Sequence, residues 1–235
     1  QSSTDIAKLL SEYRFSDAYD RLYHMVWDEV ADWYIEASKQ GVGQGMLEYV
    51  LQTILKLAHP FAPFVTETIY QTLNPGDLLI TSNWPKIITH NKSKATEFKE
   101  IKEIVTEVRQ LTKKIKLSRP TLVFEDSTLL SSNAHLITKL ANIGGTEQGS
   151  QPNGIRLISV SGWLETDQKH ISSYQKELGA KIEQTSVTIT NLQKRLSNKA
   201  YMAQAPAHVV QQTQDQLELA KADLLILKTD QTRFS

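Results

Sequence analysis

Residues 178–196 read LGAKIEQTSVTITNLQKRL, and residues 210–227 read VQQTQDQLELAKADLLIL. In both stretches a mostly apolar residue recurs at alternating steps of four and three. The positions are Leu178, Ile182, Thr185, Ile189, Leu192 and Leu196 in the first stretch, and Val210, Thr213, Leu217, Ala220, Leu224 and Leu227 in the second. This is the heptad spacing of a coiled coil, so the sequence predicts two long helices that pack along one seam.

The connection between these two stretches is short. Ser197-Asn198 is expected to stop the first helix, and Pro206 suits the first position of the second, where a backbone N–H is not needed. About nine residues are then left between the helices, too few for a long crossover. We therefore predict an antiparallel coiled-coil hairpin over residues 165–235, about 45 Å long if each helix has roughly thirty residues.

Residues 1–118 have the broader apolar faces of a helical bundle. Between Asp5 and Lys39 apolar residues recur at three- and four-residue steps, which is the period of a buried helix face. The predicted helices are one short helix before Phe15 and then about Ser16–Lys39, Met46–Ala58, Pro63–Leu73 and Ala95–Leu117. The side chains expected in the core are Trp27, Trp33, Tyr34, Leu55, Phe61, Phe64 and Ile69.

Residues 119–164 change to a mixed pattern. Thr121–Phe124 and Ile155–Val160 are rich in β-branched residues and predict strands, and Leu129–Ala141 predicts a helix between them. The fold class expected for the whole chain is therefore mainly α. It consists of a helical bundle (1–118), a small α+β unit (119–164) and the hairpin (165–235).

The composition excludes several classes of protein. The chain has 235 residues, 40% of them hydrophobic, and no cysteine, so disulfides, thiolate zinc sites and thiol catalysis are excluded. No apolar run approaches the ~20 residues that a membrane-spanning helix needs. The chain begins with Gln1 and shows no signal-peptide pattern. We expect a cytoplasmic protein, and the sequence to be a piece of a longer one.

No pattern in the sequence predicts catalysis or metal binding. The spacing of His24, His59, His90, His135, His170 and His208 does not suit zinc, and His59, at a helix break, is interpreted as a capping or packing residue. The segment Gly41–Gly45 is rich in glycine, but a phosphate-binding loop follows a strand, whereas here a helix precedes it. We interpret it as a linker. No nucleophile elbow or set of paired acids is present, so no catalytic residues and no metal ligands are predicted.

Charge is unevenly distributed although the chain has 26 basic and 26 acidic residues. Residues 86–119 contain ten Lys or Arg and four Asp or Glu, whereas residues 1–40 carry a net charge of −4. Lys113, Lys114 and Lys116 lie at the end of a predicted helix. They either stabilise the helix dipole or contact phosphates, and the charges alone leave both interpretations open.

Three segments resemble a known family. HPFAPFVTETIY (His59–Tyr70) is similar to the HPFMPFITEEIW signature in the anticodon-binding helical domain of class I aminoacyl-tRNA synthetases of the valyl, isoleucyl and leucyl group. VWDEVADWYIEASK (Val26–Lys39) resembles the FxWxxFCDWYIExxK helix of the same domain. LSNKAYMAQAPAHVV (Leu196–Val210) resembles LSNxxFVxKAPxxVV, at the tip of the coiled-coil arm of the valyl-tRNA synthetase family.

The middle of the chain resembles the family less closely. EIVTEVRQLTKK (Glu103–Lys114) is similar to IIxAIRNLRAE, with Arg109 at the first arginine. The sequence also departs from the family patterns. Thr112 occupies the position where the family has a second arginine. Likewise, Tyr70 replaces a tryptophan, Ala62 a methionine, Thr68 a glutamate and Ala31 a cysteine.

The resemblance implies a non-catalytic region that recognises the anticodon region and grips tRNA(Val). The ATP-dependent aminoacylation would be carried out by a separate N-terminal core, which would also hold the cofactors, ATP and Mg²⁺. The expected state is a monomer without membrane contact. The residues expected to bind tRNA are Arg109, Lys113, Lys114 and Lys116 at the anticodon stem, and Lys194, Arg195 and Lys199 near the hairpin tip.

Two alternatives remain open at this point. The heptads equally suit a helical interaction module whose hairpin pairs with a protein partner. The three basic residues near the turn could also serve only to keep the turn soluble, without contacting RNA.

Overall fold

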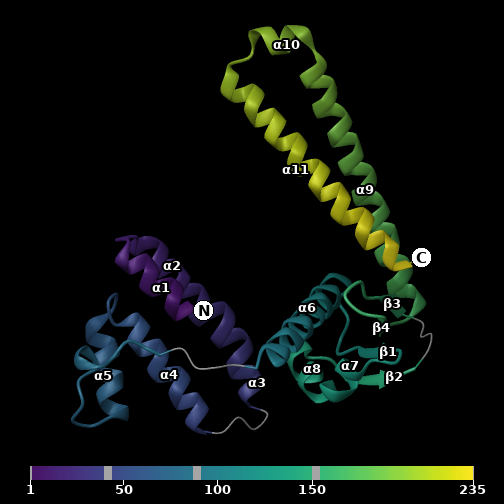
Figure 1. Cartoon of the computed structure of the whole chain (residues 1–235). Helices are drawn as coiled ribbons and strands as arrows, with labels where there is room; N and C mark the ends of the chain where they lie inside the picture. The colour runs from purple at the N-terminus through teal and green to yellow at the C-terminus, as the bar shows by residue number, and fades with distance from the viewer. Residues whose placement is uncertain (1, 40–43, 87–90, 150–153, 235) are drawn as a thin grey trace. The chain divides into compact units, whose positions relative to one another are not determined.

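The computed structural model describes residues 2–39, 44–86, 91–149 and 154–234 (Figure 1). The chain divides into two compact units, residues 1–99 and 100–235. The expected fold class is confirmed: the structure is mainly helical, with a small mixed sheet and a long helical hairpin. None of the helices in the described ranges is long and apolar enough to cross a membrane.

The first unit consists of helices close to the predicted ones. The bounds are α1 (Ser2–Ser11), α2 (Phe15–His24), a π-helical segment (Met25–Ile35), α3 (Glu36–Ser38), α4 (Gln44–Ala58), α5 (Pro63–Leu73) and a 3₁₀ turn (Leu79–Thr81). The segment from α2 to α3 is one uninterrupted helix, as predicted. The predicted linker Gly41–Gly45 lies mostly outside the described residues.

Proline and histidine define the boundary between α4 and α5. Helix α4 ends before His59-Pro60, because proline disfavours the helical conformation of the residue before it. Pro63 is the first residue of α5, where its missing N–H costs nothing. His59 Nδ1 lies 2.8 Å from the hydroxyl of the buried Thr66 in α5, so this side chain connects the end of α4 to α5.

The core of the first unit only partly matches the prediction. Trp33 and Leu55 are buried, at 8% and 4% exposure. Tyr34 and Phe61 are half-buried. Trp33 meets Phe98 edge-on, with ring centroids 6.5 Å apart.

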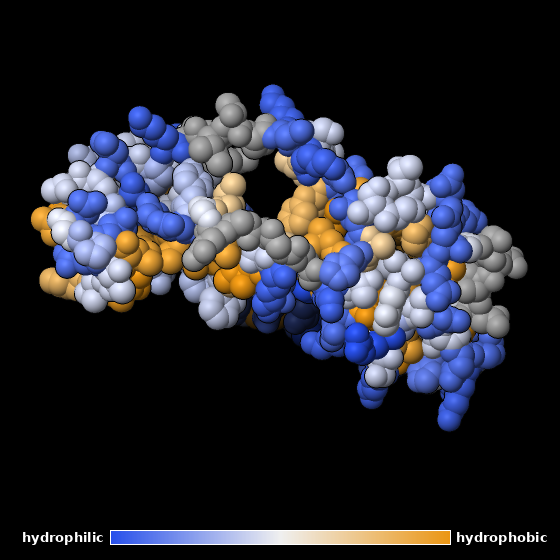
Figure 2. Space-filling view, turned by 90° about the horizontal axis from the view of Figure 1, so that it is seen from below, coloured by the Kyte–Doolittle hydropathy of each residue, from blue (hydrophilic) through white to orange (hydrophobic). Residues whose placement is uncertain are grey.

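The prediction of burial was wrong for Trp27, Phe64 and Ile69, which are 64%, 89% and 40% exposed. Met25, Val26 and Trp27 are consecutive, and three consecutive residues cannot all face one side of a helix. Met25 is buried in the core cluster and Val26 packs against that cluster, so Trp27 is left outside. In α5 the buried positions are Thr66 and Tyr70 instead. Hydrophobic patches consequently interrupt the surface of this unit, at the left of Figure 2.

The second unit has a four-stranded sheet beside helix α6 (Lys92–Ile115), which starts in the first unit. The strand order is β2-β1-β4-β3, with β1 parallel to β2 and antiparallel to β4. The other bounds are β1 (Thr121–Phe124), α7 (Thr128–Ser132), α8 (Ala134–Ala141), β2 (Gly145–Gln148), β3 (Gly154–Arg156) and β4 (Gly162–Glu165).

The sequence predicted this unit incompletely. Strand β1 has the predicted bounds, but the predicted helix Leu129–Ala141 is broken between α7 and α8, at Asn133. The predicted strand Ile155–Val160 stops at Arg156, because the N–H groups of Ile158 and Ser159 bond to the carboxylate of Glu107 instead of to a strand. Strands β2 and β4 were not predicted.

The hairpin is confirmed. Helix α9 (Gln168–Ser197) runs beside α11 (Ala207–Gln231), and the short α10 (Lys199–Gln204) crosses the free end (Figure 1). All twelve heptad positions are buried or half-buried, while most residues beside them are exposed. Pro206 is the residue before α11 rather than its first residue, and a 3₁₀ turn (Thr232–Phe234) follows α11. We call α9, α10 and α11 the arm.

Candidate nucleic-acid interface

The described residues contain no group of three or more His, Asp or Glu side chains placed to hold a metal ion. The distribution of basic side chains offers a candidate binding surface. Two places matter: the end of α6 with the base of the arm, and the tip of the arm.

The structure separates the four basic residues predicted at the end of α6. Arg109 is half-buried, and its Nε donates to the carbonyl of Leu140, in the last turn of α8, at 2.7 Å. Lys114 Nζ lies 2.8 Å from Asp230 Oδ2, at the end of the arm. Lys113 and Lys116 are exposed. Two of the four basic side chains thus already bind within the second unit, while the other two face solvent.

A group of ionised and polar side chains joins the arm to α6 and the sheet. We call Glu107, Lys114, Tyr174, Asp230 and Arg233 the basal cluster. Arg233 forms an ion pair with Glu107, and its Nε donates to Asp230 Oδ1 at 3.0 Å. Tyr174 of α9 donates its hydroxyl to Asp230 Oδ2 at 3.3 Å. The side chains of Arg233 and Asp230 are each only 8% exposed.

The hydrogen bonds of the basal cluster keep both carboxylates ionised. Burial raises the pKa of Glu107, but hydrogen bonds from Ser159, Arg233 and Ile158 outweigh it and hold that pKa below its ordinary value. Burial likewise opposes ionisation of Asp230, yet Lys114 and Arg233 lower its pKa overall. Burial and the charge of Asp230 raise the pKa of Tyr174 to about 12, so its hydroxyl remains a donor at neutral pH.

The tip of the arm is held by specific contacts. The side chain of Asn198 accepts from the N–H groups of Ala200 and Tyr201, at 2.9 and 3.3 Å, and so caps α10. The hydroxyl of Tyr201 lies 2.7 Å from that of Thr213 in α11. The guanidinium of Arg195 lies over the ring of Tyr201, 4.6 Å from its centroid. The turn therefore presents its basic side chains from a fixed backbone.

The outer part of the arm is basic. No Asp or Glu occurs between Glu183 and Asp215, whereas Lys194, Arg195 and Lys199 lie there, all of them exposed. Most other exposed residues of this stretch are Gln, Asn, Ser or Thr, which donate hydrogen bonds without charge. Exposed cations among neutral donors suit a phosphate backbone.

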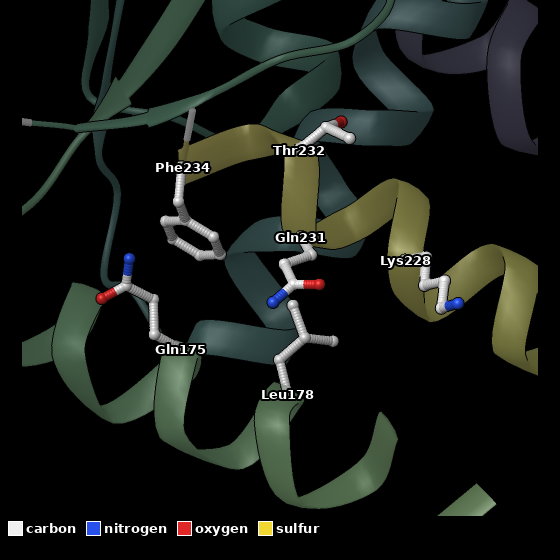
Figure 3. A pocket seen from close by; sticks show the side chains of 6 residues that line it. All are labelled: Gln175, Leu178, Lys228, Gln231, Thr232 and Phe234. Atoms are coloured by element: carbon white, nitrogen blue, oxygen red, sulfur yellow. The ribbon is translucent and has the colours of Figure 1, made fainter. Parts of the chain in front are cut away.

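A groove of about 520 Å³ lies at the base of the arm (Figure 3). Gln175 and Leu178 line it from α9, and the other lining residues come from α11 and the turn after it: Lys228, Gln231, Thr232 and Phe234. Its polar groups are amides, a hydroxyl and one ammonium. These groups can donate hydrogen bonds to a bound molecule.

The basal cluster was not found by sequence reasoning. Glu107 and Arg233 are 126 residues apart, and Lys114 and Asp230 are 116 residues apart. No local spacing connects such residues, and Asp230 lies outside the heptad positions. The exposed basic residues of the tip, in contrast, were visible as a charge cluster beside a turn.

Comparison with known proteins finds two matched parts of the chain. Residues 1–125 match the anticodon-binding domain of tRNA ligases, and residues 169–233 match the tRNA-binding arm of valyl-tRNA synthetases. The chain is similar to valine–tRNA ligases from Bacillus subtilis (25% identity over 89% of this chain), Nocardia farcinica (29% over 90%) and Petrotoga mobilis (28% over 91%). The matched region is 26–28% of the length of these relatives.

The chain belongs to the family of anticodon-binding domains of tRNA ligases, which matches more than half of its length. Because the valyl arm follows this domain in the same chain, the two parts are the anticodon-binding domain and the tRNA-binding arm of a valyl-tRNA synthetase. Both matched families are described as parts that bind tRNA.

Proposed function

We propose that the chain binds tRNA(Val) at two places and holds it for ATP-dependent aminoacylation by a catalytic core outside this chain. The bundle takes the anticodon region, and the arm takes another part of the same molecule. The observation that carries the proposal is the outer part of the arm, which has exposed cations, no carboxylates and a rigidly capped turn. Such contacts raise affinity and position a substrate without doing chemistry.

The seven predicted basic residues are proposed as the tRNA contacts, but their surroundings in the structure differ. Lys113 and Lys116 are exposed and available to phosphates of the anticodon stem. Lys194, Arg195 and Lys199 are exposed at the tip and available to phosphates of another part of the tRNA. Arg109 and Lys114 already bind Leu140 and Asp230. We propose that these two side chains keep those bonds and attract RNA phosphates through their positive charge.

The remaining parts of the proposal concern the whole protein. The functional domains are proposed to be residues 1–118, 119–164 and 165–235, following the changes in sequence pattern. The protein is proposed to be a cytoplasmic monomer. ATP and Mg²⁺ are proposed to bind in the catalytic core, and this chain supplies none of their ligands.

The test is deletion of Gln168–Ser235 from the full-length enzyme. We expect a clear loss of tRNA(Val) affinity and of aminoacylation, with unchanged activation of the amino acid, because tRNA is the only substrate that the arm is proposed to contact. Unchanged tRNA affinity and aminoacylation would contradict a role of the arm in gripping tRNA.

The deletion also removes Asp230 and Arg233, so a smaller change is needed as a control. The triple variant Lys194→Gln, Arg195→Gln and Lys199→Gln, called the tip variant, removes charge and leaves the base intact. It should lower affinity in the same direction. The salt dependence of binding should become shallower by roughly one unit for each phosphate that is no longer neutralised.

A second candidate function is pairing of the arm with a protein. It is favoured by apolar residues on the outside of α11, where Leu219, Leu225 and Ile226 are 67%, 68% and 60% exposed. Titration of the chain with tRNA(Val) and with a non-cognate tRNA, each at two salt concentrations, separates the two functions. Absence of salt-dependent binding to either tRNA would favour the protein partner.

A further inference from the structure

We propose that Arg233 is a positioning residue for tRNA binding: it fixes the direction of the arm without contacting RNA. The inference rests on the proposed function of the arm and adds how the direction of the arm is fixed. The basal cluster is its structural basis. The relevant residues all lie within the second compact unit.

One guanidinium connects three elements at the base of the arm. Arg233 lies in the turn after α11, and its Nε donates to Asp230, in the last turn of that helix. Its Nη1 donates to Glu107 of α6 and to the carbonyl of Arg156 in β3, the latter at 3.2 Å. The planar fork of arginine can serve several acceptors in fixed directions, which a lysine ammonium cannot do.

The partners of Arg233 are themselves held. Glu107 accepts from the N–H groups of Ile158 and Ser159, at 2.7 and 2.9 Å, so its carboxylate also fixes the loop after β3. Asp230 accepts from Lys114 of α6 and from Tyr174 of α9. Both helices of the hairpin are therefore bonded to α6 through the basal cluster.

These contacts join residues from two matched parts of the sequence, all within the second compact unit. Glu107 and Lys114 fall within residues 1–125, which match the anticodon-binding domain. Asp230 and Arg233 fall within residues 169–233, which match the tRNA-binding arm. Apolar support at the base includes Tyr174 against Phe234, with ring centroids 5.7 Å apart. Apolar contacts are not directional, so the ion pairs with fixed geometry set the orientation.

The experiment compares Arg233→Met with Lys228→Met in the full chain. Lys228 is exposed on α11, the helix that precedes Arg233, so its replacement removes the same charge near the base without touching the basal cluster. The chain has no cysteine, so spin labels can be attached uniquely through Ser132→Cys and Gln193→Cys, two exposed positions on α7 and α9. Pulsed electron paramagnetic resonance then measures the distance between the two labels, one beside the sheet and one on the outer arm.

We expect a narrow distance distribution in the parent chain and in Lys228→Met, and a broad one in Arg233→Met. Affinity for tRNA(Val) should fall roughly tenfold in Arg233→Met, while helix content by circular dichroism stays the same. Arg233→Lys keeps the charge but not the fork, and it should give an intermediate width and affinity. It also serves as the test if the methionine variant does not fold.

Each other outcome overturns a defined part of the proposal. A narrow distribution in both Arg233 variants would overturn the positioning role. A broad distribution with unchanged affinity would show that arm direction does not matter for tRNA, which also overturns it. If the tip variant bound tRNA as tightly as the parent chain, the proposed contact between the arm and tRNA would be contradicted. That result would overturn the proposed function rather than the positioning role of Arg233.

Discussion

Trp27 and Trp33 lie six residues apart on one uninterrupted helix, yet their surroundings are opposite. Trp33 is 8% exposed and meets Phe98, whereas Trp27 is 64% exposed and stacks on Tyr23 with ring planes 7° apart. Hydrophobicity alone predicted burial of both. Only the choice of which helix face meets the neighbouring helices separates them, and that choice is made by tertiary packing.

Trp33→Ala should therefore lower the free energy of unfolding by about 3–5 kcal/mol, because it leaves a cavity in the core. Trp27→Ala is the matched control and should change it by less than about 0.5 kcal/mol. Urea unfolding of the two variants measures the difference. Equal stability of the parent chain and the Trp33 variant would contradict the burial of this ring.

Glu107 should make stability depend on pH. Its pKa is lower in the folded chain than the ordinary value, so folding favours the ionised carboxylate. This contribution is present above the ordinary pKa of about 4.5 and is lost as the pH falls through the lower, folded pKa. The melting temperature should consequently drop in acid, and Glu107→Gln should make the drop shallower.

The control for this measurement is Glu183→Gln, which removes a carboxylate from the exposed surface of α9. Thermal melts between about pH 6 and pH 3 span the relevant window. If Glu107→Gln kept the full acid sensitivity of the parent chain, Glu107 would not be responsible for it.

At the scale of elements, the long helices were predictable, whereas only β1 of the sheet was predicted with its bounds. The arm has an uninterrupted heptad pattern, and α4 and α5 are bounded by prolines, so local sequence determines them. Strands β2 and β4 each have four residues and begin with glycine, and both pair with β1, which is distant from them in sequence. The basal cluster had no signal for the same reason, since its members meet only after folding.

Gly179 gives a test at this scale. It lies in α9, is exposed and has no atom within 4 Å of the position a Cβ would take. Gly179→Ala should stabilise the arm by about 0.5–1 kcal/mol, because alanine loses less backbone entropy in a helix. Chemical denaturation monitored by helix content measures this gain.

Gly154→Ala is the contrasting variant. In β3 an added Cβ would lie 2.5 Å from the backbone oxygen of Leu164 in β4. Strand pairing would have to shift, at a cost of about 1–3 kcal/mol. If both alanine variants had the same effect, the packing described for these two glycines would be wrong.

At the scale of the whole molecule, zero net charge conceals a division of charge along the sequence. The acid-free stretch of the arm is basic, while residues 1–40 carry a net charge of −4. Phosphate contacts carry no sequence information, so the tip should contribute affinity and no discrimination among tRNAs.

The tip variant should therefore weaken binding of tRNA(Val) and of a non-cognate tRNA by the same factor. The ratio of the two dissociation constants, measured at one salt concentration, is the informative quantity. A changed ratio would show that the tip reads the identity of the tRNA.

The thirty residues of α9 also make the arm a lever about 45 Å long. On such a lever a rotation of roughly 5° at the base moves the far end by roughly 4 Å, which is more than the length of a hydrogen bond. The angular tolerance at the base is therefore only a few degrees if contacts at the tip are to survive. An exchange of one side chain at the base can thus disengage residues that it never touches, and the distance between cause and effect is the length of the helix.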